Sequence, residues 1–266
     1  MEYGILGPVR VRDGATEIVL DGAKQRTVLA ALLLAEGSVV ADTGLSWFLW
    51  GGRPPATLSA QLYNHVSRVR RALGPEAGIV RRAHGYEMRT GTAFVDLLEF
   101  RELAGRGKVA LAEGKYREAS DLLRGALVLW RGPALAGVSE HLAGAEGPPL
   151  EEARTTVLAG RIEADLALGR HPRLLPELTR LVSRHPLHER FRAQLMTALY
   201  RCDRQGEALA VYDRGRHLLA RELGVEPGPL LRGVHRAILT ADPRLYEPLS
   251  PVDALDALDE RRRDPT

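Results

Sequence analysis

The sequence predicts a mainly α-helical protein in two parts: an N-terminal winged helix-turn-helix with small β-sheets and a wing hairpin, then an all-α array of helical hairpins. The first part shows short strands, three helices and a hairpin, which is the order of a winged helix. Strand signals stop after Val95, and only helical segments follow. A length of 266 residues suits two domains. We therefore expect one domain over 1–94, a second over 95–243, and a disordered tail over 244–266, which is rich in proline and charge.

Glycine and proline punctuate the first domain. Gly7-Pro8 and Asp13-Gly14 separate three strand-like pieces, and Gly37 follows an Ala/Leu-rich run where a helix C-cap is expected. Ala83-His84-Gly85 lies at the centre of the last strand-like stretch, where a hairpin turn is expected. The expected elements are strands over 3–6, 9–11 and 17–20, helices over 24–36, 43–50 and 56–73, and a hairpin over 79–88.

The second domain contains a repeated helical pattern. Breaks at Gly169 and Asp203 lie 34 residues apart, which is the period of tetratricopeptide hairpins. A similar break at Gly114 precedes Gly169 by more than one period, and the Gly/Pro-rich insertion over 131–149 accounts for the excess. We therefore expect tetratricopeptide-like helices over 98–113, 115–130, 150–168, 171–184, 187–202, 204–222 and 229–240.

The helix expected over 56–73 has two distinct faces. At 100° per residue, one face is an apolar stripe that we expect to be buried, formed by Leu62, Val66, Val69 and Leu73. The opposite face carries amides and hydroxyls early and guanidinium groups later: Thr57, Gln61, Asn64, Ser67, Arg68 and Arg71. This order suits a helix that enters the major groove of DNA. The plain alternative is an amphipathic helix whose outer face is only solvated.

The positive charge is concentrated around that helix. The net charge is +3, yet the stretch from Arg53 to Arg89 contains seven arginines and two glutamates. Arg81 and Arg82 stand side by side on the expected hairpin, with no acid nearby until Glu87. A wing with two adjacent arginines can touch the backbone or the minor groove. Helix and hairpin together therefore favour nucleic-acid binding over the plain alternative.

The residues resemble the Streptomyces antibiotic regulatory protein family of transcriptional activators. The resemblance extends over about residues 3–243 and includes ILGPVRV at 5–11, KQRTVLAALLLAEGSVV at 24–40, LWGGRPP at 49–55, NHVSRVRRALG at 64–74, HGYEMR at 84–89 and ALVLWRGPAL at 126–135. It implies an OmpR-type winged helix followed by a bacterial transcriptional activation domain. Such proteins bind direct repeats of double-stranded promoter DNA, as a dimer on DNA in our expectation. They recruit RNA polymerase and its sigma factor, commonly for a secondary-metabolite gene cluster.

The resemblance also suggests roles for individual residues. Phosphate-contacting positions match Arg68, Arg70 and Arg71, and wing positions match Arg81 and Arg82. A basic box at the first long helix matches Lys24, Gln25 and Arg26. Residues that choose the base sequence are expected at the start of the reading helix: Thr57, Ser59, Gln61 and Asn64. Five phosphate contacts would give a slope of log affinity against log salt of about −4 to −5.

Trp47 departs from the family pattern, in which an acidic or polar residue is usual before Leu-Trp-Gly. By helical geometry it points away from the face of Leu45 and Leu49. One interpretation is that Trp47 packs against the neighbouring domain. The other is that Trp47 and Arg53, with the loop 51–55, form a surface that contacts RNA polymerase, because exposed aromatic residues mark interfaces.

Other classes of protein find little support in the sequence. Cys202 is the sole cysteine, and His185-x-x-His188 has no third ligand in register, so we expect no metal, cofactor or catalytic site. No signal peptide is readable and the longest apolar run, 28–35, is too short to span a membrane, so we expect a cytoplasmic, nucleoid-associated protein. Two alternatives stay open: a tetratricopeptide-like interaction scaffold, and a regulator that senses a small ligand or a phosphorylated partner.

Overall fold

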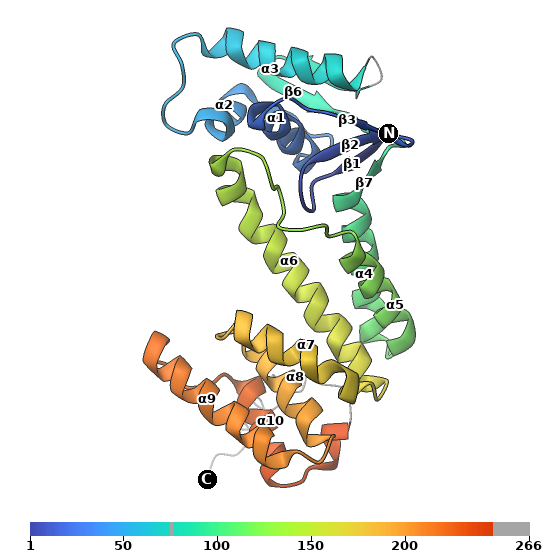
Figure 1. Cartoon of the computed structure of the whole chain (residues 1–266), viewed down its shortest axis with the longest axis vertical. Helices are drawn as coiled ribbons and strands as arrows, with labels where there is room; N and C mark the ends of the chain where they lie inside the picture. The colour runs from blue at the N-terminus through green and yellow to red at the C-terminus, as the bar shows by residue number, and fades with distance from the viewer. Residues whose placement is uncertain (75–76, 247–266) are drawn as a thin grey trace, which may run out of the picture. The chain divides into compact units, whose positions relative to one another are not determined.

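The computed structural model describes residues 1–74 and 77–246 (Figure 1). The chain forms two compact units, each built from two stretches of sequence. The first unit combines Met1–Gly105 with Arg124–Val157, and the second combines Arg106–Leu123 with the chain from Leu158 onward. The fold is mainly helical with small sheets, as the sequence predicts.

The first unit begins with a four-stranded sheet in the order β3-β2-β1-β7. Its strands are β1 (Glu2–Gly4), β2 (Arg10–Asp13), β3 (Thr16–Ile18) and β7 (Phe94–Val95). The first three pair antiparallel, and β7 pairs parallel to β1, with Glu2 opposite Phe94. The sequence did not predict β7, because two residues are too few to show an alternating pattern.

The winged helix follows. Its helices are α1 (Ala23–Leu34), α2 (Asp42–Trp50) and α3 (Leu58–Leu73), and its second sheet, in the order β4-β6-β5, contains β4 (Val40–Ala41), β5 (Ile79–Arg82) and β6 (Gly85–Met88). α1 packs against both α2 and α3, and its residues from Thr27 to Leu33 are all buried. The predicted order of three helices and a hairpin is confirmed.

The amphipathic pattern of α3 is also confirmed. Its buried residues are the four of the predicted stripe: Leu62, Val66, Val69 and Leu73. Burial of each such side chain contributes roughly 1.5–3 kcal/mol. The stripe therefore fixes which face of α3 points into the unit and leaves the opposite face for solvent or a partner.

The remaining helices belong to the predicted helical array. They are α4 (Asp96–Ala112), α5 (Tyr116–Val128), α6 (Glu140–Ala167), α7 (His171–Arg184), α8 (Glu189–Tyr200), α9 (Gln205–Leu223) and α10 (Pro229–Leu239). In the second unit α8 packs against α7, α9 and α10, around the fully buried side chains of Phe191 and Met196. None of the described helices is both long and apolar enough to cross a membrane.

Two boundaries differ from the predictions. α6 begins at Glu140 and runs through Pro148 and Pro149, where proline suggested a break. Leu142 and Leu150 are both buried about two turns apart, so tertiary packing outweighs the lost amide donors. The chain from Pro243 to Tyr246 forms a 3₁₀ turn with Leu245 buried, so the prediction of disorder is wrong for residues 244–246. The rest of the predicted tail, 247–266, lies outside the described residues.

Part of the predicted insertion packs on the winged helix within the first unit. Backbone hydrogen bonds join Arg131 to Leu6 and Leu135 to Ile5. The hydroxyl of Ser139 donates to the carbonyl of Phe48 at 2.5 Å, while its amide donates to the hydroxyl of Thr27 at 2.8 Å. The compact unit around α1–α3 therefore includes residues well beyond position 94.

Candidate nucleic-acid interface

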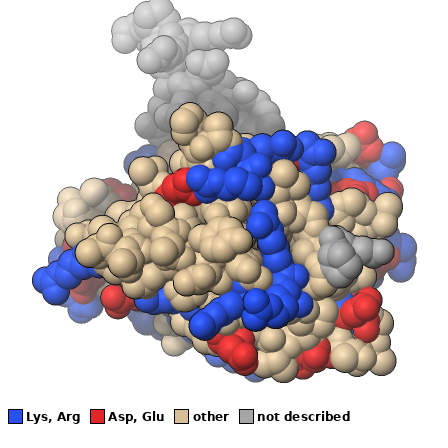
Figure 2. Space-filling model, turned by 90° about the horizontal axis from the view of Figure 1, so that it is seen from above, with Lys and Arg blue, Asp and Glu red and all other residues tan. Residues whose placement is uncertain are grey.

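The outer face of α3 carries polar and basic side chains. Thr57, Ser59, Asn64, Arg68 and Arg71 are exposed, and Arg68 and Arg71 form no hydrogen bond or ion pair with any other described residue. Figure 2, which views the molecule from the end that carries α3 in Figure 1, shows a band of Lys and Arg side chains across this face, with acidic side chains mostly at its margins. Donors and cations thus face outward, as contact with a polyanion requires.

Two of the predicted base-reading residues already interact with each other. Gln61 is half-buried, and its side-chain amide donates to the hydroxyl of Thr57 at 3.1 Å. This contact holds the amide at the start of α3, four residues after Thr57 in the sequence. Asn64 and Ser59 are exposed on the same helix. The first two turns of α3 therefore present a set of amides and hydroxyls to the solvent.

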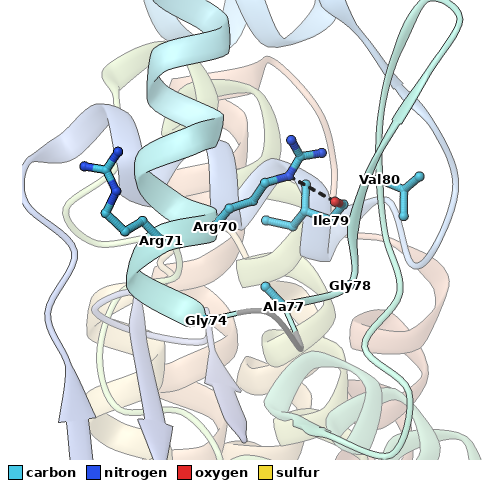
Figure 3. A pocket seen from close by; sticks show the side chains of 7 residues that line it. All are labelled: Arg70, Arg71, Gly74, Ala77, Gly78, Ile79 and Val80. Carbon is cyan, nitrogen blue, oxygen red and sulfur yellow. Dashed lines mark hydrogen bonds between the residues drawn. The ribbon is translucent and has the colours of Figure 1, made fainter.

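Arg70 and Arg71 diverge at the end of α3. Arg70 reaches toward the hairpin and its Nε donates to the carbonyl of Ile79 at 3.0 Å, whereas Arg71 points away from the hairpin (Figure 3). Both line an open hollow of about 500 Å³ between α3 and β5. The guanidinium of Arg70 also lies 5.7 Å from the ring centre of Tyr86. Arg70 therefore joins helix and wing, and Arg71 is left outward.

On the wing, both predicted arginines have acidic partners. The terminal nitrogens of Arg81 donate to the two carboxylate oxygens of Asp42 at 2.5 and 2.7 Å. These hydrogen bonds raise the pKa of Arg81. Asp42 lies in the first turn of α2, so the expectation that no acid lies near Arg81 before Glu87 is wrong: the acid comes from 39 residues earlier in the sequence.

Arg82 shares a carboxylate with Arg89. Arg82 Nε donates to Glu87 at 2.6 Å, and Arg89 Nε donates to the other oxygen of the same carboxylate. Hydrogen bonds from the two arginines lower the pKa of Glu87 to about 2. Glu87 therefore stays ionised across the physiological range and removes one of the two positive charges beside it.

The residues of the box at the start of α1 are engaged in contacts within their own unit. Gln25 is buried, and Arg26 donates to the carbonyls of Gly137 at 2.7 Å and Leu20 at 3.1 Å. The ammonium of Lys24 lies 5.0 Å from the ring centre of Trp50. Gln25 is buried and the guanidinium of half-exposed Arg26 is bound to two backbone carbonyls, so this geometry argues against the expected DNA contacts of these two residues. They are left out of the interface proposed below.

Trp47 contacts a residue of the predicted second domain and is also half-exposed; its role toward RNA polymerase stays a prediction. Its ring centre lies 6.0 Å from that of His141, a residue of the predicted second domain, while 48% of Trp47 remains exposed. Gly51 has a φ of +59°, and a Cβ there would lie 2.5 Å from the His141 ring. His141 thus supports the start of the exposed loop 51–55, which carries Arg53.

The histidines set aside in the sequence have structural partners. His188 caps α8, its Nδ1 accepting from the amide of Phe191 at 3.3 Å, and its ring stacks on Phe191. His185 contacts the same phenyl ring. Among the described residues there is no group of three or more His, Cys, Asp or Glu that could hold a metal ion.

Asp42 and Tyr86 are the interface residues that sequence reasoning missed. Tyr86 sits beneath the guanidinium groups of both Arg70 and Arg81, at 5.7 and 4.7 Å from its ring centre. An acid in the first turn of a helix is explained by the helix dipole alone, so no local pattern pairs Asp42 with a distant arginine.

The comparisons with known proteins show the family to which the chain belongs. The profile of the bacterial transcriptional activator domain matches residues 95–239. Regulatory protein DnrI of Streptomyces peucetius is 39% identical over 254 residues, which cover 91% of this chain and 93% of DnrI. The chain belongs to the Streptomyces antibiotic regulatory protein family. The family resemblance read from the sequence is therefore confirmed.

Two further relatives are longer than this chain. Regulatory protein AfsR of Streptomyces coelicolor is 43% identical over 249 residues, but these residues make up only 25% of AfsR. The structure of Mycobacterium tuberculosis EmbR in complex with a low-affinity phosphopeptide matches with a TM-score of 0.88 at 30% identity, over 98% of this chain and 71% of EmbR. This match supports the predicted winged helix followed by a helical domain.

Proposed function

We propose that this family member is a sequence-specific DNA-binding activator that binds direct repeats near a promoter and recruits RNA polymerase through its sigma factor, for a secondary-metabolite gene cluster. The observation that carries the proposal is the outer face of α3, where Asn64, Arg68 and Arg71 are exposed beside the wing. A regulator of this kind acts in the cytoplasm, at the nucleoid. The proposal assigns the chain no catalytic step and no cofactor.

The residues divide into those that read bases and those that hold phosphate. Gln61 and Asn64 carry amides that can pair with adenine, and Arg68 can pair with guanine or clamp a phosphate. Thr57 and Ser59 stand at the helix start, where hydroxyls can reach base edges or backbone. Phosphate contact is assigned to Arg70 and Arg71 on α3, and to Arg81 and Arg82 on the wing. The two wing arginines would contact phosphate while they remain paired with their acidic partners. Lys24 remains a half-exposed candidate.

The decisive experiment is selection of duplexes from a random pool by the full-length protein. We expect a directly repeated motif to be enriched, and the protein to bind it with two copies per duplex and a steep dependence on salt. Footprinting on promoters that contain the motif then maps the site. Failure to enrich any motif, or affinity that does not change with salt concentration, would falsify the proposal.

The surface around Trp47 is proposed to contact RNA polymerase, together with Arg53. The half-exposed indole and the loop that His141 supports give this surface a fixed shape. We expect Trp47→Ala to leave promoter affinity unchanged and to lower transcription from that promoter severalfold in a reconstituted system. Truncation of an aromatic anchor at an interface commonly weakens the binding free energy by roughly 1–2 kcal/mol or more.

Val128→Ala is a suitable control for this variant, because Val128 is 75% exposed on α5 and lies on no surface assigned here. If Trp47→Ala and Val128→Ala support the same level of transcription at saturating DNA occupancy, the polymerase assignment is wrong.

A further inference from the structure

Asp42 joins the wing to the start of α2 by three hydrogen bonds. Its carboxylate accepts two hydrogen bonds from Arg81. Its amide donates to the carbonyl of His84, in the turn of the wing, at 2.9 Å. The residue before it, Ala41, pairs with Gly85 in the sheet. The backbone contacts of residues 41 and 42 with the wing therefore position the carboxylate of Asp42 beside Arg81.

The guanidinium of Arg81 is engaged at one edge by Asp42 and on one face by Tyr86. Both terminal nitrogens bond to Asp42, in the fork geometry that a phosphate would use. One face of the group lies over the Tyr86 ring, 4.7 Å from its centre. Asp42 thus occupies the edge of Arg81 that would otherwise clamp a DNA phosphate, and its charge cancels that of the arginine.

This pair borders a hollow between the reading helix and the wing. The hollow has a volume of about 250 Å³ and is lined by Asp42, Ser59, Tyr63, Arg70, Arg81 and Tyr86, among others. Asp42 is 31% exposed and Arg81 is 47% exposed, so both can be reached by a bound duplex. The only acid in this lining faces the space between the two DNA-contacting elements.

We propose that Asp42 is a specificity-setting residue of the DNA interface, because it orients Arg81 and neutralises its charge. The wing then contacts a duplex of matching shape without increasing the affinity for DNA of any sequence. The inference rests on the proposed function. Non-specific binding depends almost entirely on neutralised phosphates, so a pre-neutralised arginine contributes little to it. Arg81 should therefore not count as a full phosphate contact, and the wild-type salt slope should be shallower than five contacts would give.

The test compares the wild type with Asp42→Asn in salt titrations on two duplexes, a mixed-sequence 30-base-pair duplex and a duplex selected by the wild type. Asparagine has the size of aspartate but carries no charge, so Arg81 becomes a full cation. We expect the slope on mixed-sequence DNA to become more negative by about 0.9, so that the loss of affinity between 50 and 200 mM salt grows by about 3.5-fold. Affinity for the mixed sequence should rise more than affinity for the selected one.

Two further variants separate this effect from others. Asp13→Asn also removes one negative charge from the first unit, at a 70% exposed carboxylate in the other sheet, and should leave the slope unchanged. The double variant Asp42→Asn/Arg81→Ala removes the whole neutral pair and should restore the wild-type slope. Thermal melting checks that each variant is folded.

The possible outcomes are distinguishable. A wild type that binds no DNA overturns the proposed function and this inference with it. A wild type that binds with a steep salt slope, beside a folded Asp42→Asn of equal slope and equal discrimination, overturns this inference alone. The inference also fails if the double variant has a slope shallower than the wild type by about 0.9, because Arg81 would then be a full phosphate contact despite Asp42. That last comparison holds even if the single variant does not fold.

Discussion

Arg71 and Arg81 carry the same formal charge, but only Arg81 is paired with an acid in the described part of the chain. Their roles toward DNA should differ accordingly. Arg71 has no acidic partner among residues 1–74 and 77–246 and lies on the outer face of α3, whereas Arg81 is one half of a neutral pair. Asn64, without charge, can add hydrogen-bond selectivity but little long-range attraction. The function of each polar residue here depends on its partners as much as on its type.

We therefore predict different losses for Arg71→Ala and Asn64→Ala. Arg71→Ala should weaken binding to all sequences alike and make the salt slope less negative by about 0.9. Asn64→Ala should relax discrimination at one base pair by about 1–3 kcal/mol and leave the slope unchanged. Competition titrations with single-base variants of a selected duplex measure both effects. A change of sequence preference in Arg71→Ala would contradict the assignment of Arg71 to phosphate.

At the scale of elements, the wing depends on a close approach of two backbones. Val40 and Ala41 in β4 pair with Tyr86 and Gly85 in β6. A Cβ on Gly85 would lie 2.1 Å from the carbonyl oxygen of Val40, so a glycine is required there for steric reasons. The same pairing brings the start of α2, with Asp42, beside the wing. Gly85 therefore supports both the shape of the wing and the ion pair that we assign to its function.

We predict that Gly85→Ala destabilises the protein by about 1–3 kcal/mol, because the added methyl group meets rigid backbone. Urea unfolding of the full chain measures the loss. Gly105→Ala is the matched control: it lies in helix α4 with no atom within 4 Å of an added Cβ, and it should be neutral or stabilising. Equal unfolding midpoints for Gly85→Ala and wild type would show that β4 can move away at no cost.

At the scale of the molecule, buried polar groups as well as apolar cores stabilise the two units. In the second unit burial opposes ionisation of Asp165, but hydrogen bonds from Ser120, Arg170 and Arg161 outweigh it and lower its pKa. Those partners come from three separate segments of the chain. Burial also lowers the pKa of His65 in the first unit, and of His171 and His235 in the second.

These histidines predict an acid-sensitive fold. A histidine whose pKa is lower in the folded state binds protons more strongly when unfolded, so each proton taken up favours unfolding. The contribution of these histidines to the stability of both units should be constant above the ordinary histidine pKa of 6.5 and should fall as the pH drops below it. Thermal midpoints measured from pH 8 to pH 5 check this, with His171→Gln expected to flatten part of the fall. A midpoint that is independent of pH over that range would contradict it.

The amino-acid sequence alone determined the family, the fold class and the face of α3 that is buried, because these follow from local periodicity, turn residues and ordered motifs. The apolar stripe of α3 and the hairpin of the wing are examples. Only the tertiary structure decided which basic residues are available. Asp42 and Arg81 stand 39 residues apart and Arg26 and Gly137 stand 111 apart, and pairings between distant residues leave no local pattern to read. Likewise α6 runs through two prolines because its neighbours bury its leucines, and no propensity within that segment could show this.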